Sequence, residues 1–420
     1  MRVTRRRLIG SAAAGAAALA APAAIGAARP HVVVIGGGAG GATAARYLAR
    51  DGKGAIAVTL VEPTRTYHTC FFSNLYLGGF RTLESIAHSY GRLAAMGINV
   101  VHDWAVGIDR DTRTVALAGG GSLGYDRLIV APGIDFRWDS VPGHGIAAQN
   151  AMPHAWKAGS QTELLKAQIA SMPEGGVFAM VAPPNPYRCP PGPYERVSMV
   201  AHQLSRTNPT AKIMIFDPKP KFSKQALFEE GWAAHYPGMI EWLEPDFGGR
   251  IDEVRPDAME IVSDGEAVKV DVANVIPAQK AGRIAEIAGL ADASGFCPIV
   301  PATMQSRMDP AVHVLGDATI AGDMPKSGFS ANSQAKVAAM AVRAALTGST
   351  AFPPRFSNTC WSLIATGDGV KVGARYEATE EKIAKTEGFI SQTGEDAELR
   401  RQTYEESLGW YAGITADIFG

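Results

Sequence analysis

The stretch His31-Val-Val-Val-Ile-Gly-Gly-Gly-Ala-Gly-Gly41 decides the fold of this 420-residue chain. A short β-branched strand runs directly into a G-x-G-x-x-G turn, and a helical pattern continues to Arg50. A second strand at Ala57–Val61 ends at the acid Glu62. This order of strand, glycine turn, helix, strand and acid is typical of a dinucleotide-binding Rossmann unit.

Each position of the turn has a separate role in such a unit. Gly36 permits the tight turn, Gly38 lets a pyrophosphate approach the backbone where the helix opens at Ala39, and Gly41 allows close helix packing. The Glu62 carboxylate can accept hydrogen bonds from an adenosine ribose. We therefore expect these five residues to bind a dinucleotide.

Two later segments favour FAD over NAD(P) at this first site. A strand ends in Gly-Asp at 316–317, and after a loop Lys-Ser-Gly at 326–328 opens an alanine-rich helix that runs to Ala345. The positive end of that helix would stabilise the negative charge of a reduced isoalloxazine, and the acid can hold ribityl hydroxyls. The strand and turn at 125–133 return the chain to the cofactor. The expected flavin contacts are Gly133, Gly316, Asp317, Lys326, Ser327 and Gly328.

A second βαβ unit carries a different loop. Strands at Val177–Val181 and Lys212–Phe216 flank a helix expected from Tyr194 to Arg206. The loop between them reads Ala182-Pro-Pro-Asn-Pro-Tyr-Arg-Cys-Pro-Pro-Gly-Pro-Tyr-Glu195. Prolines offer no N–H groups and a rigid backbone, so this loop cannot cradle a pyrophosphate, and we expect it to bind no NAD(P). Its simplest alternative is a rigid structural turn with an incidental thiol at Cys189.

These units predict an α/β fold with two Rossmann-like domains and a C-terminal α+β tail. Together they resemble flavoproteins with two dinucleotide-binding domains, such as glutathione reductase and sulfide:quinone reductase. We expect a discontinuous FAD-binding domain at 29–148 and 279–349, and an inserted second domain at 149–278. The tail at 350–420 would cover the flavin or form an interface.

The first 28 residues resemble a twin-arginine signal peptide. Arg5-Arg6 precedes an alanine-rich stretch that holds no acidic residue and ends in small residues. We expect export of the folded protein to the periplasm and no integral membrane anchor after cleavage. Cleavage removes four arginines, so the formal net charge changes from −1 to −5. A mildly acidic mature chain argues against nucleic acid and anionic membrane surfaces as partners.

The four cysteines, Cys70, Cys189, Cys297 and Cys360, are far apart in the sequence. No Cys-x-x-Cys-His motif is present, so the chain cannot attach a c-type haem in the usual way, and no zinc-site spacing appears. We expect no metal. Cys297, in the segment Gly-Phe-Cys-Pro at 295–298, is expected to be a buried packing thiol.

Several motifs together resemble the flavoprotein subunit of flavocytochrome c sulfide dehydrogenase. They are Tyr67-His-Thr-Cys70, the Cys189 loop, Met324-Pro-Lys-Ser-Gly-Phe-Ser-Ala-Asn-Ser-Gln334, Asn358-Thr-Cys360, Gly409-Trp-Tyr411 and Asp417-Ile-Phe-Gly420. The resemblance implies FAD bound covalently through an 8α-S-cysteinyl thioether to Cys70. It also implies a redox disulfide between Cys189 and Cys360, a separate c-type cytochrome subunit, and oxidation of sulfide to sulfur or polysulfide.

The residue types at and near the cysteines indicate how hydrosulfide could react there. Hydrosulfide is a good nucleophile toward a disulfide, and a helix start just after Cys189 would lower the pKa of its thiol. Glu195 would either manage protons or serve as a dipole partner in the first turn of the helix. Trp410 would either cover the flavin or fill a core.

Four other interpretations stay open at the level of the sequence. A sulfide:quinone reductase also combines cysteines with a flavin, but it needs a membrane-binding surface. A thiosulfate-oxidising multienzyme system uses a similar flavoprotein. A pyridine-nucleotide disulfide reductase is opposed by the proline-filled second loop and by the lack of a Cys-x4-Cys pair near Gly41. A flavin-binding electron-transfer module without catalysis is opposed by the two cysteines beyond Cys70.

Overall fold

The glycine turn joins the central strand of the largest sheet to a long helix, as the sequence pattern predicts. The computed structural model describes residues 29–420. β1 (His31–Ile35) runs into α1 (Ala39–Gly52) and pairs in parallel with β2 (Ala57–Val61) and β9 (Arg127–Val130). The sheet has the strand order β22-β19-β20-β21-β9-β1-β2-β5. Its remaining strands are β19 (Cys297–Val300), β20 (Gln305–Ser306) and β21 (Asp309–Val314), with β5 (Asn99–Val101) and β22 (Thr319–Ile320) at the two edges.

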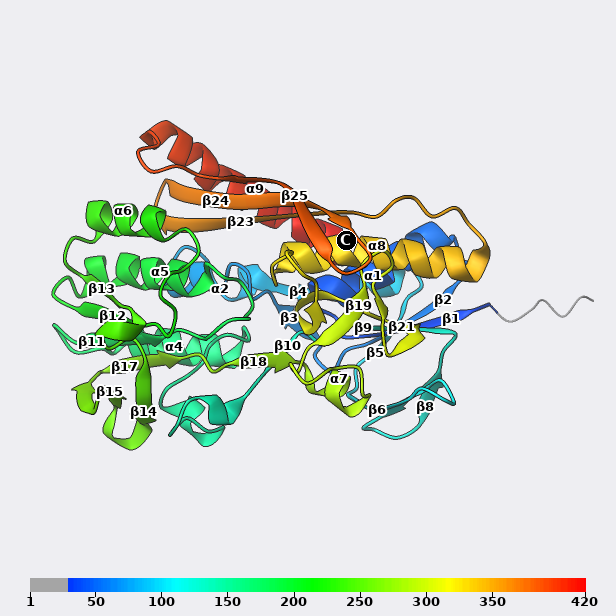
Figure 1. Cartoon of the computed structure of the whole chain (residues 1–420), viewed down its shortest axis with the longest axis horizontal. Coiled ribbons are helices and arrows are strands. Elements are labelled where there is room, and N and C mark those ends of the chain that lie inside the picture. The colour runs from blue at the N-terminus through cyan, green and yellow to red at the C-terminus, as the bar shows by residue number, and fades with distance from the viewer. Residues whose placement is uncertain (1–28) are drawn as a thin grey trace, which may run out of the picture.

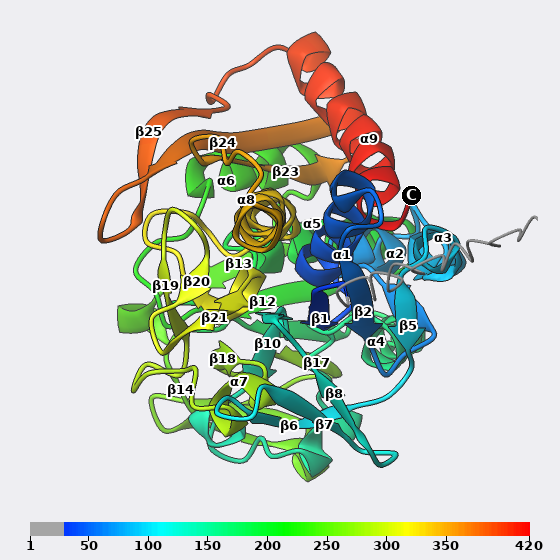
Figure 2. The ribbon, with the colours of Figure 1, turned by 90° about the vertical axis from the view of Figure 1, so that its right-hand side faces the viewer.

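Strands that are distant in sequence place the expected cofactor residues at one edge of this sheet. β21 pairs in parallel with β9, and β9 pairs in parallel with β1. The carboxyl ends of these three strands therefore lie together, and they are followed by Gly36, Gly133 and Gly316. α8 (Gly328–Thr347) packs beside α1 on one face of the sheet (Figures 1 and 2).

Small elements surround the large sheet. A three-stranded antiparallel sheet, β6 (Ala105–Asp109), β7 (Thr114–Leu117) and β8 (Ser122–Gly124), lies beside the short helix α7 (Arg283–Ile287). β3 (Thr66–His68) and β4 (Ala87–Ser89) form a two-stranded sheet. The short helices α2 (Ser73–Leu77) and α3 (Gly91–Ala95) complete this part of the chain.

The second βαβ unit forms its own parallel sheet, seen on the left in Figure 1. The strand order is β13-β12-β11-β17, with β11 (Val177–Val181), β12 (Lys212–Phe216), β13 (Ile240–Leu243) and β17 (Val272–Val275). Its helices are α4 (Ser160–Ala170), α5 (Gly192–Thr207) and α6 (Gln225–His235). The expected strands are confirmed at their bounds, and α5 begins two residues before the expected helix start. An antiparallel sheet of β14 (Ile251–Arg255), β15 (Glu260–Ser263) and β16 (Glu266–Lys269) lies beside it.

A pair of short strands connects the two parallel sheets. β10 (Ile134–Phe136) pairs in antiparallel fashion with β18 (Gln279–Ala281), where the chain leaves and re-enters the part built on the eight-stranded sheet. We propose on this basis that 149–278 is an inserted domain between 29–148 and 279–349.

The C-terminal segment is the α+β tail that the sequence predicts, and it bridges both cores. β23 (Arg355–Ala365) and β24 (Asp368–Ala378) form a long hairpin, followed by β25 (Ile383–Ile390) and α9 (Ala397–Phe419) (Figure 1). Phe356 and Tyr376 join the core of the eight-stranded sheet, whereas Ile364 and Val370 join the core of the four-stranded one. Burial of an aliphatic side chain contributes about 1.5–3 kcal/mol, so the hairpin holds the two parts together.

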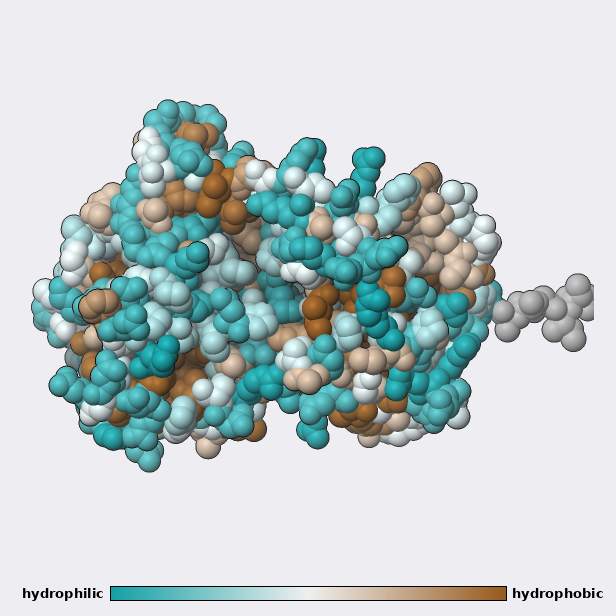
Figure 3. Space-filling model, in the orientation of Figure 1, coloured by the Kyte–Doolittle hydropathy of each residue, from teal (hydrophilic) through white to brown (hydrophobic). Residues whose placement is uncertain are grey.

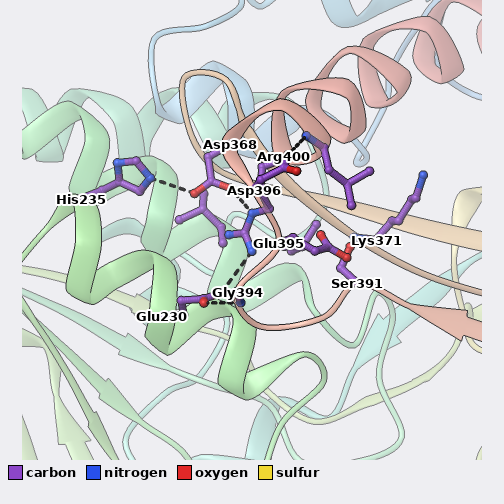
Figure 4. Close-up of polar contacts among 12 residues, drawn as sticks. Glu230, His235, Asp368, Lys371, Ser391, Gly394, Glu395, Asp396 and Arg400 are labelled. Carbon is purple, nitrogen blue, oxygen red and sulfur yellow. Dashed lines mark hydrogen bonds and ion pairs between the residues drawn. The ribbon is translucent and has the colours of Figure 1, made fainter.

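A charged cluster fixes the tip of this hairpin. The Asp368 carboxylate accepts hydrogen bonds from Arg400 Nε at 2.5 Å and from His235 at 2.8 Å (Figure 4). Glu230 of α6 lies 3.4 Å from the Arg400 guanidinium and accepts from the Gly394 N–H. Arg400 is 6% exposed, and it joins α6, the hairpin and the start of α9.

The predicted fold class is confirmed by these sheets and helices. In residues 29–420, no helix combines the length and the hydropathy needed to cross a membrane. On the face shown in Figure 3, hydrophilic residues predominate and hydrophobic ones gather in small separate areas. The expected signal peptide at 1–28 lies outside the described residues.

Candidate active site

A cavity of about 940 Å³ lies at the carboxyl edge of the large sheet. Gly36, Gly38, Ala39, Glu62 and Gly133 line it. α1 begins at Ala39 with no side-chain cap, so its first N–H groups are free to face an anion in this cavity. The large cavity therefore offers a phosphate site at its glycine turn.

The glycines of the turn are required by close contacts. A Cβ at Gly36, whose φ is 96°, would lie 2.3 Å from the Ala131 carbonyl oxygen. A Cβ at Gly41 would lie 1.8 Å from the Gly36 carbonyl oxygen. Gly41 does not line the large cavity, and its position fits the expected role in close helix packing.

Two carboxylates of the large cavity can still accept hydrogen bonds from the hydroxyl groups of a ligand. Glu62 accepts from the Gly37 N–H at 2.7 Å and from Thr64, which leaves a lone pair for a ribose. Asp317 is 9% exposed, and its Oδ1 has no hydrogen-bond partner. A buried unpaired acceptor is costly, so a ligand hydroxyl is the natural partner for Asp317. These residues fit the dinucleotide that the sequence predicts.

The start of α8 reaches the same cavity at Gly328. A Cβ at Gly328 would lie 2.7 Å from a ring carbon of Phe71, so only glycine fits there. Ser327 caps α8 by accepting from the Ser330 N–H at 3.0 Å, and it lines a neighbouring cavity instead.

Lys326 differs from its expected place among the flavin contacts. It lines neither cavity. Its ammonium donates to the carbonyls of Asp317 at 2.9 Å and Thr319 at 2.6 Å, because a buried amine must find acceptors. Lys326 thus fixes the Gly-Asp turn and touches the cofactor cavity only through that turn.

A second cavity, of about 70 Å³, brings together the residues expected to carry the chemistry. Cys70, Cys189, Cys360, Glu195 and Trp410 all line this cysteine cavity. Cys70 also lines the large cavity, so the two cavities meet at its thiol. Within the described residues all four cysteines are free thiols, and Cys297 is fully buried in β19, as expected for a packing thiol.

The backbone of Cys189 has a conformation that residues other than glycine rarely adopt. Its φ is 59°, its N–H donates to the Lys326 carbonyl at 2.7 Å, and its own carbonyl accepts from the Gly192 N–H at 2.8 Å. A Cβ at Gly192 would lie 3.0 Å from the Cys189 sulfur. Left-handed backbone at a residue other than glycine costs free energy, and this cost is found mostly at functional sites.

The expected lowering of the Cys189 pKa is wrong for the thiol in this environment. Burial raises its pKa well above the ordinary value, and nearby Cys360 and Glu195 raise it further. The helix starts at Gly192, three residues after Cys189, and loss of hydration outweighs its dipole. Burial raises the pKa of Cys360 as well, although Asn358 and Lys224 oppose that rise.

Glu195 is held by two donors inside the protein. Its carboxylate accepts from Asn74 Nδ2 at 2.8 Å and from the Leu363 N–H at 3.0 Å. Burial raises the pKa of Glu195, and these hydrogen bonds oppose the rise. The acid therefore does more than offset a helix dipole, since it ties α2, α5 and β23 together beside the cysteines.

Trp410 lies among aromatic rings at the rim of the cysteine cavity. Its ring stacks on Trp361 at 5.3 Å and lies near Phe71 at 5.6 Å. Its indole Nε1 is buried and has no partner among the described residues. Trp410 lines the cavity and also packs against two hydrophobic cores, so both expected roles remain predictions.

Three cations of the site, of which Arg188 is partly buried and Arg196 and Lys224 are buried, are not among the residues that the sequence predicts. Arg188 lines both cavities and lies 3.8 Å from Asp317. Arg196 donates to Asn74 and Asn274, and burial lowers its pKa to about 9. Lys224 donates to Ser362 Oγ at 2.7 Å and to the Cys360 carbonyl at 3.2 Å. The only sequence signal for Arg196 is its place just before the largely apolar run Val197–Ala201 of α5.

The proline-filled loop is packed with protein side chains. Tyr194 is fully buried, donates to the Asp217 carboxylate, and stacks on Phe222 at 3.7 Å. Asp217 stands at the end of β12, where a ribose-binding acid would stand, yet it also pairs with Lys219 at 2.6 Å. No such acid is free at this loop.

Residues 29–420 place no group of three His, Cys, Asp or Glu side chains where they could hold a metal ion.

Comparisons with known proteins agree with this geometry. The model of the pyridine nucleotide-disulphide oxidoreductase family matches residues 30–168. The model of the central part of the sulfide dehydrogenase [flavocytochrome c] flavoprotein chain matches 162–277, and the flavocytochrome c sulphide dehydrogenase flavin-binding model matches 352–419.

Solved structures share the fold at low identity. The sulfide:quinone oxidoreductase of Aquifex aeolicus has a TM-score of 0.71 at 18% identity, over 92% of each chain. The NAD-dependent persulfide reductase of A. fulgidus has a TM-score of 0.63 at 17% identity, over 90% of this chain and 77% of that one. Putidaredoxin reductase, in its covalent complex with putidaredoxin, has a TM-score of 0.64 at 19% identity, over 83% and 82%.

The fold and the cavities define a flavoprotein of the pyridine nucleotide-disulphide oxidoreductase class. Within that class, the chain belongs to the family of the flavocytochrome c sulfide dehydrogenase flavoprotein subunit. It is an FAD-binding oxidoreductase of the sulfide dehydrogenase type.

Proposed function

We propose that this chain oxidises hydrosulfide to sulfur or polysulfide through a redox disulfide between Cys189 and Cys360. The observation that carries the proposal is the cysteine cavity, which Cys189 and Cys360 line together with Cys70. Cys70, which lines both cavities, would hold FAD covalently by an 8α-S-cysteinyl thioether.

The sulfur steps follow from the cysteines. Hydrosulfide attacks one sulfur of the disulfide, the S–S bond breaks, and one cysteine becomes a persulfide while the other leaves as a thiolate. A second hydrosulfide removes the outer sulfur as a disulfane anion with release of one proton, which leaves two cysteine sulfurs to re-form the disulfide. FAD, when bound, supplies the acceptor for the electron pair released as that bond forms.

The remaining residues would control this chemistry without exchanging electrons. Glu195 would take the released proton, since burial raises its pKa and it lies at the cavity. Trp410 and its aromatic neighbours would exclude water from the thiolates. Gly36, Gly38, Glu62 and Asp317 would hold the cofactor.

The decisive experiment compares three variants of the flavin-loaded enzyme by anaerobic stopped-flow spectrophotometry. Cys189→Ser and Cys360→Ser are expected to fold, keep covalent FAD, and lose at least about a hundredfold in sulfide-dependent flavin bleaching, on the scale of losing a covalent catalyst. Cys297→Ser is the matched control and is expected to bleach normally. If either active-site serine variant bleaches at the wild-type rate, hydrosulfide attacks the flavin directly and the disulfide relay is wrong.

We also propose a c-type cytochrome subunit as the electron acceptor, in a heterodimer. The family name supports a flavocytochrome complex, and the absence of a Cys-x-x-Cys-His motif in this sequence supports a separate haem chain. The reduced flavoprotein is expected to reduce a co-purified haem protein faster than it reduces a soluble quinone analogue. The opposite order would favour a sulfide:quinone reductase.

Periplasmic location through twin-arginine export is proposed from residues 1–28. Changing Arg5 and Arg6 to lysine is expected to retain the precursor in the cytoplasm, which a fractionation blot would measure. An unchanged periplasmic yield would refute the export route.

A further inference from the structure

The two cysteines of the cavity have unequal surroundings. Asn358 Nδ2 donates to the Cys360 sulfur at 3.4 Å, and Asn358 is itself fixed by Ser327, whose Oγ donates to its Oδ1 at 2.6 Å. Within the described residues, no hydrogen-bond donor is recorded at the Cys189 sulfur. A thiolate would therefore be better stabilised at Cys360 than at Cys189.

Lys224 adds a positive charge on the Cys360 side. It is 5% exposed, and its ammonium donates to Ser362 Oγ at 2.7 Å, to the Cys360 carbonyl at 3.2 Å and to the Val370 carbonyl at 3.5 Å. All three acceptors are neutral, so no carboxylate within residues 29–420 is hydrogen-bonded to this buried cation. Among the charges that act on Lys224, the largest favourable one is a Cys360 thiolate.

The position of Lys224 is fixed from both ends of α6. Lys224 precedes the first residue of that helix, with φ of 63°. Glu230 in the middle of α6 and His235 at its last residue are held by Arg400 and Asp368 (Figure 4). These ion pairs fix α6, and with it the backbone of Lys224, beside the hairpin of β23 and β24.

We propose that Lys224 is a positioning residue that polarises the disulfide, so that Cys360 leaves as the thiolate and Cys189 accepts the sulfur atom. The inference rests on the proposed disulfide relay and assigns a direction to it. In the step concerned, hydrosulfide forms a bond to Cys189 Sγ, and the Cys189–Cys360 bond breaks. Its electron pair stays on Cys360 Sγ, in the residue whose carbonyl accepts from the Lys224 ammonium. Thiol–disulfide exchange favours the leaving sulfur with the better stabilised thiolate.

Charged groups around Lys224 set the pH range of this effect. Cys360 of β23, Glu195 of α5 and Cys189 favour its charged form, whereas Arg400 of α9 opposes it. Burial lowers the pKa of Lys224 to about 8. With both cysteines as free thiols, the ammonium is thus present below this pH and is lost above it.

A first test needs no substitution. The oxidised wild-type enzyme is mixed with sulfide, quenched with iodoacetamide within the first turnover, and digested for peptide mass analysis. The extra sulfur atom is expected on the Cys189 peptide, with plain alkylation at Cys360. A persulfide on Cys360 would overturn the inference alone, whereas the lack of a disulfide or of any cysteine persulfide would overturn the proposed function.

A second test measures the charge effect. In Cys189→Ser, the pH midpoint for alkylation of Cys360 is expected to rise by about one unit when Lys224→Met is added, and to return with Lys224→Arg. Lys221→Met is the matched control, because Lys221 is an exposed lysine of the same segment. An unchanged midpoint in Lys224→Met would overturn the inference.

A third readout is the ratio of flavin reduction rates of wild type and Lys224→Met across pH. The protonation of hydrosulfide and of flavin changes with pH in the same way in both proteins, so these two effects cancel in the ratio of rates. The ratio is expected to be about tenfold at pH 6.5 and to fall toward one above pH 8, as the ammonium loses its proton. A ratio that does not change with pH would indicate a purely structural role and would contradict the proposal.

Discussion

The Asp217 carboxylate lies 2.6 Å from the Lys219 ammonium, and both side chains are buried at the end of β12. Tyr194 and Trp242 also donate to this carboxylate. An acid with this many partners has little capacity left for ribose hydroxyls, and the prolines before α5 leave few N–H groups for a pyrophosphate.

We therefore predict that NADH and NADPH neither bind nor reduce the flavin. Isothermal titration calorimetry of the flavin-loaded protein is expected to show no NADH binding tighter than roughly 100 μM. ADP-ribose serves as a control ligand without redox chemistry. Saturable binding of either ligand below that concentration would show that the second loop is a working nucleotide site.

Cys70 is predicted to be the attachment point of FAD, because its thiol lies where the large cavity meets the cysteine cavity. In Cys70→Ser the cofactor should stay bound through Asp317 and the glycine turn, yet be released by trichloroacetic acid. Wild type and Cys297→Ser should keep the yellow colour in the pellet. Flavin that is released from wild type by acid would rule out the thioether.

Arg400 is predicted to be a main stabilising contact of the tail. Arg400→Met leaves Asp368 and Glu230 without their guanidinium, and loss of one partner of a buried pair costs about 3 kcal/mol. Arg401→Met is the matched control, since this exposed arginine pairs only with Glu398 and Glu405, and exposed ion pairs contribute little. Urea unfolding would measure both, and equal changes would contradict the prediction.

Much of the fold follows from local sequence patterns. The glycine turn, the two βαβ units and the alanine-rich helix are encoded within short segments, so strand and helix bounds agree with expectation to within a few residues. Cys189 and Cys360 were found through motifs of a known family. Their neighbourhood could not be derived from composition or spacing.

The charged side chains of the site could not be predicted in the same way. Lys224 lies in a segment that looks like a polar surface loop, and its carbonyl partner on Cys360 is 136 positions away. Arg196 finds its amide partners 122 and 78 positions away. A cation can be buried only where other elements supply hydrogen-bond acceptors, and the sequence around the cation does not indicate those acceptors.

Helix α9 closes the face of α1 with residues from the far end of the sequence. Asp417 accepts from Tyr47 at 2.9 Å and from Asn332 at 2.9 Å, and Phe419 stacks on His88 at 4.7 Å. Partners 370 positions apart can meet only after most of the chain has been synthesised. The nucleotide-binding unit, although it is made first, therefore acquires its final covering late. Premature termination before α9 would yield a protein with an exposed α1 face, prone to aggregate rather than to retain cofactor.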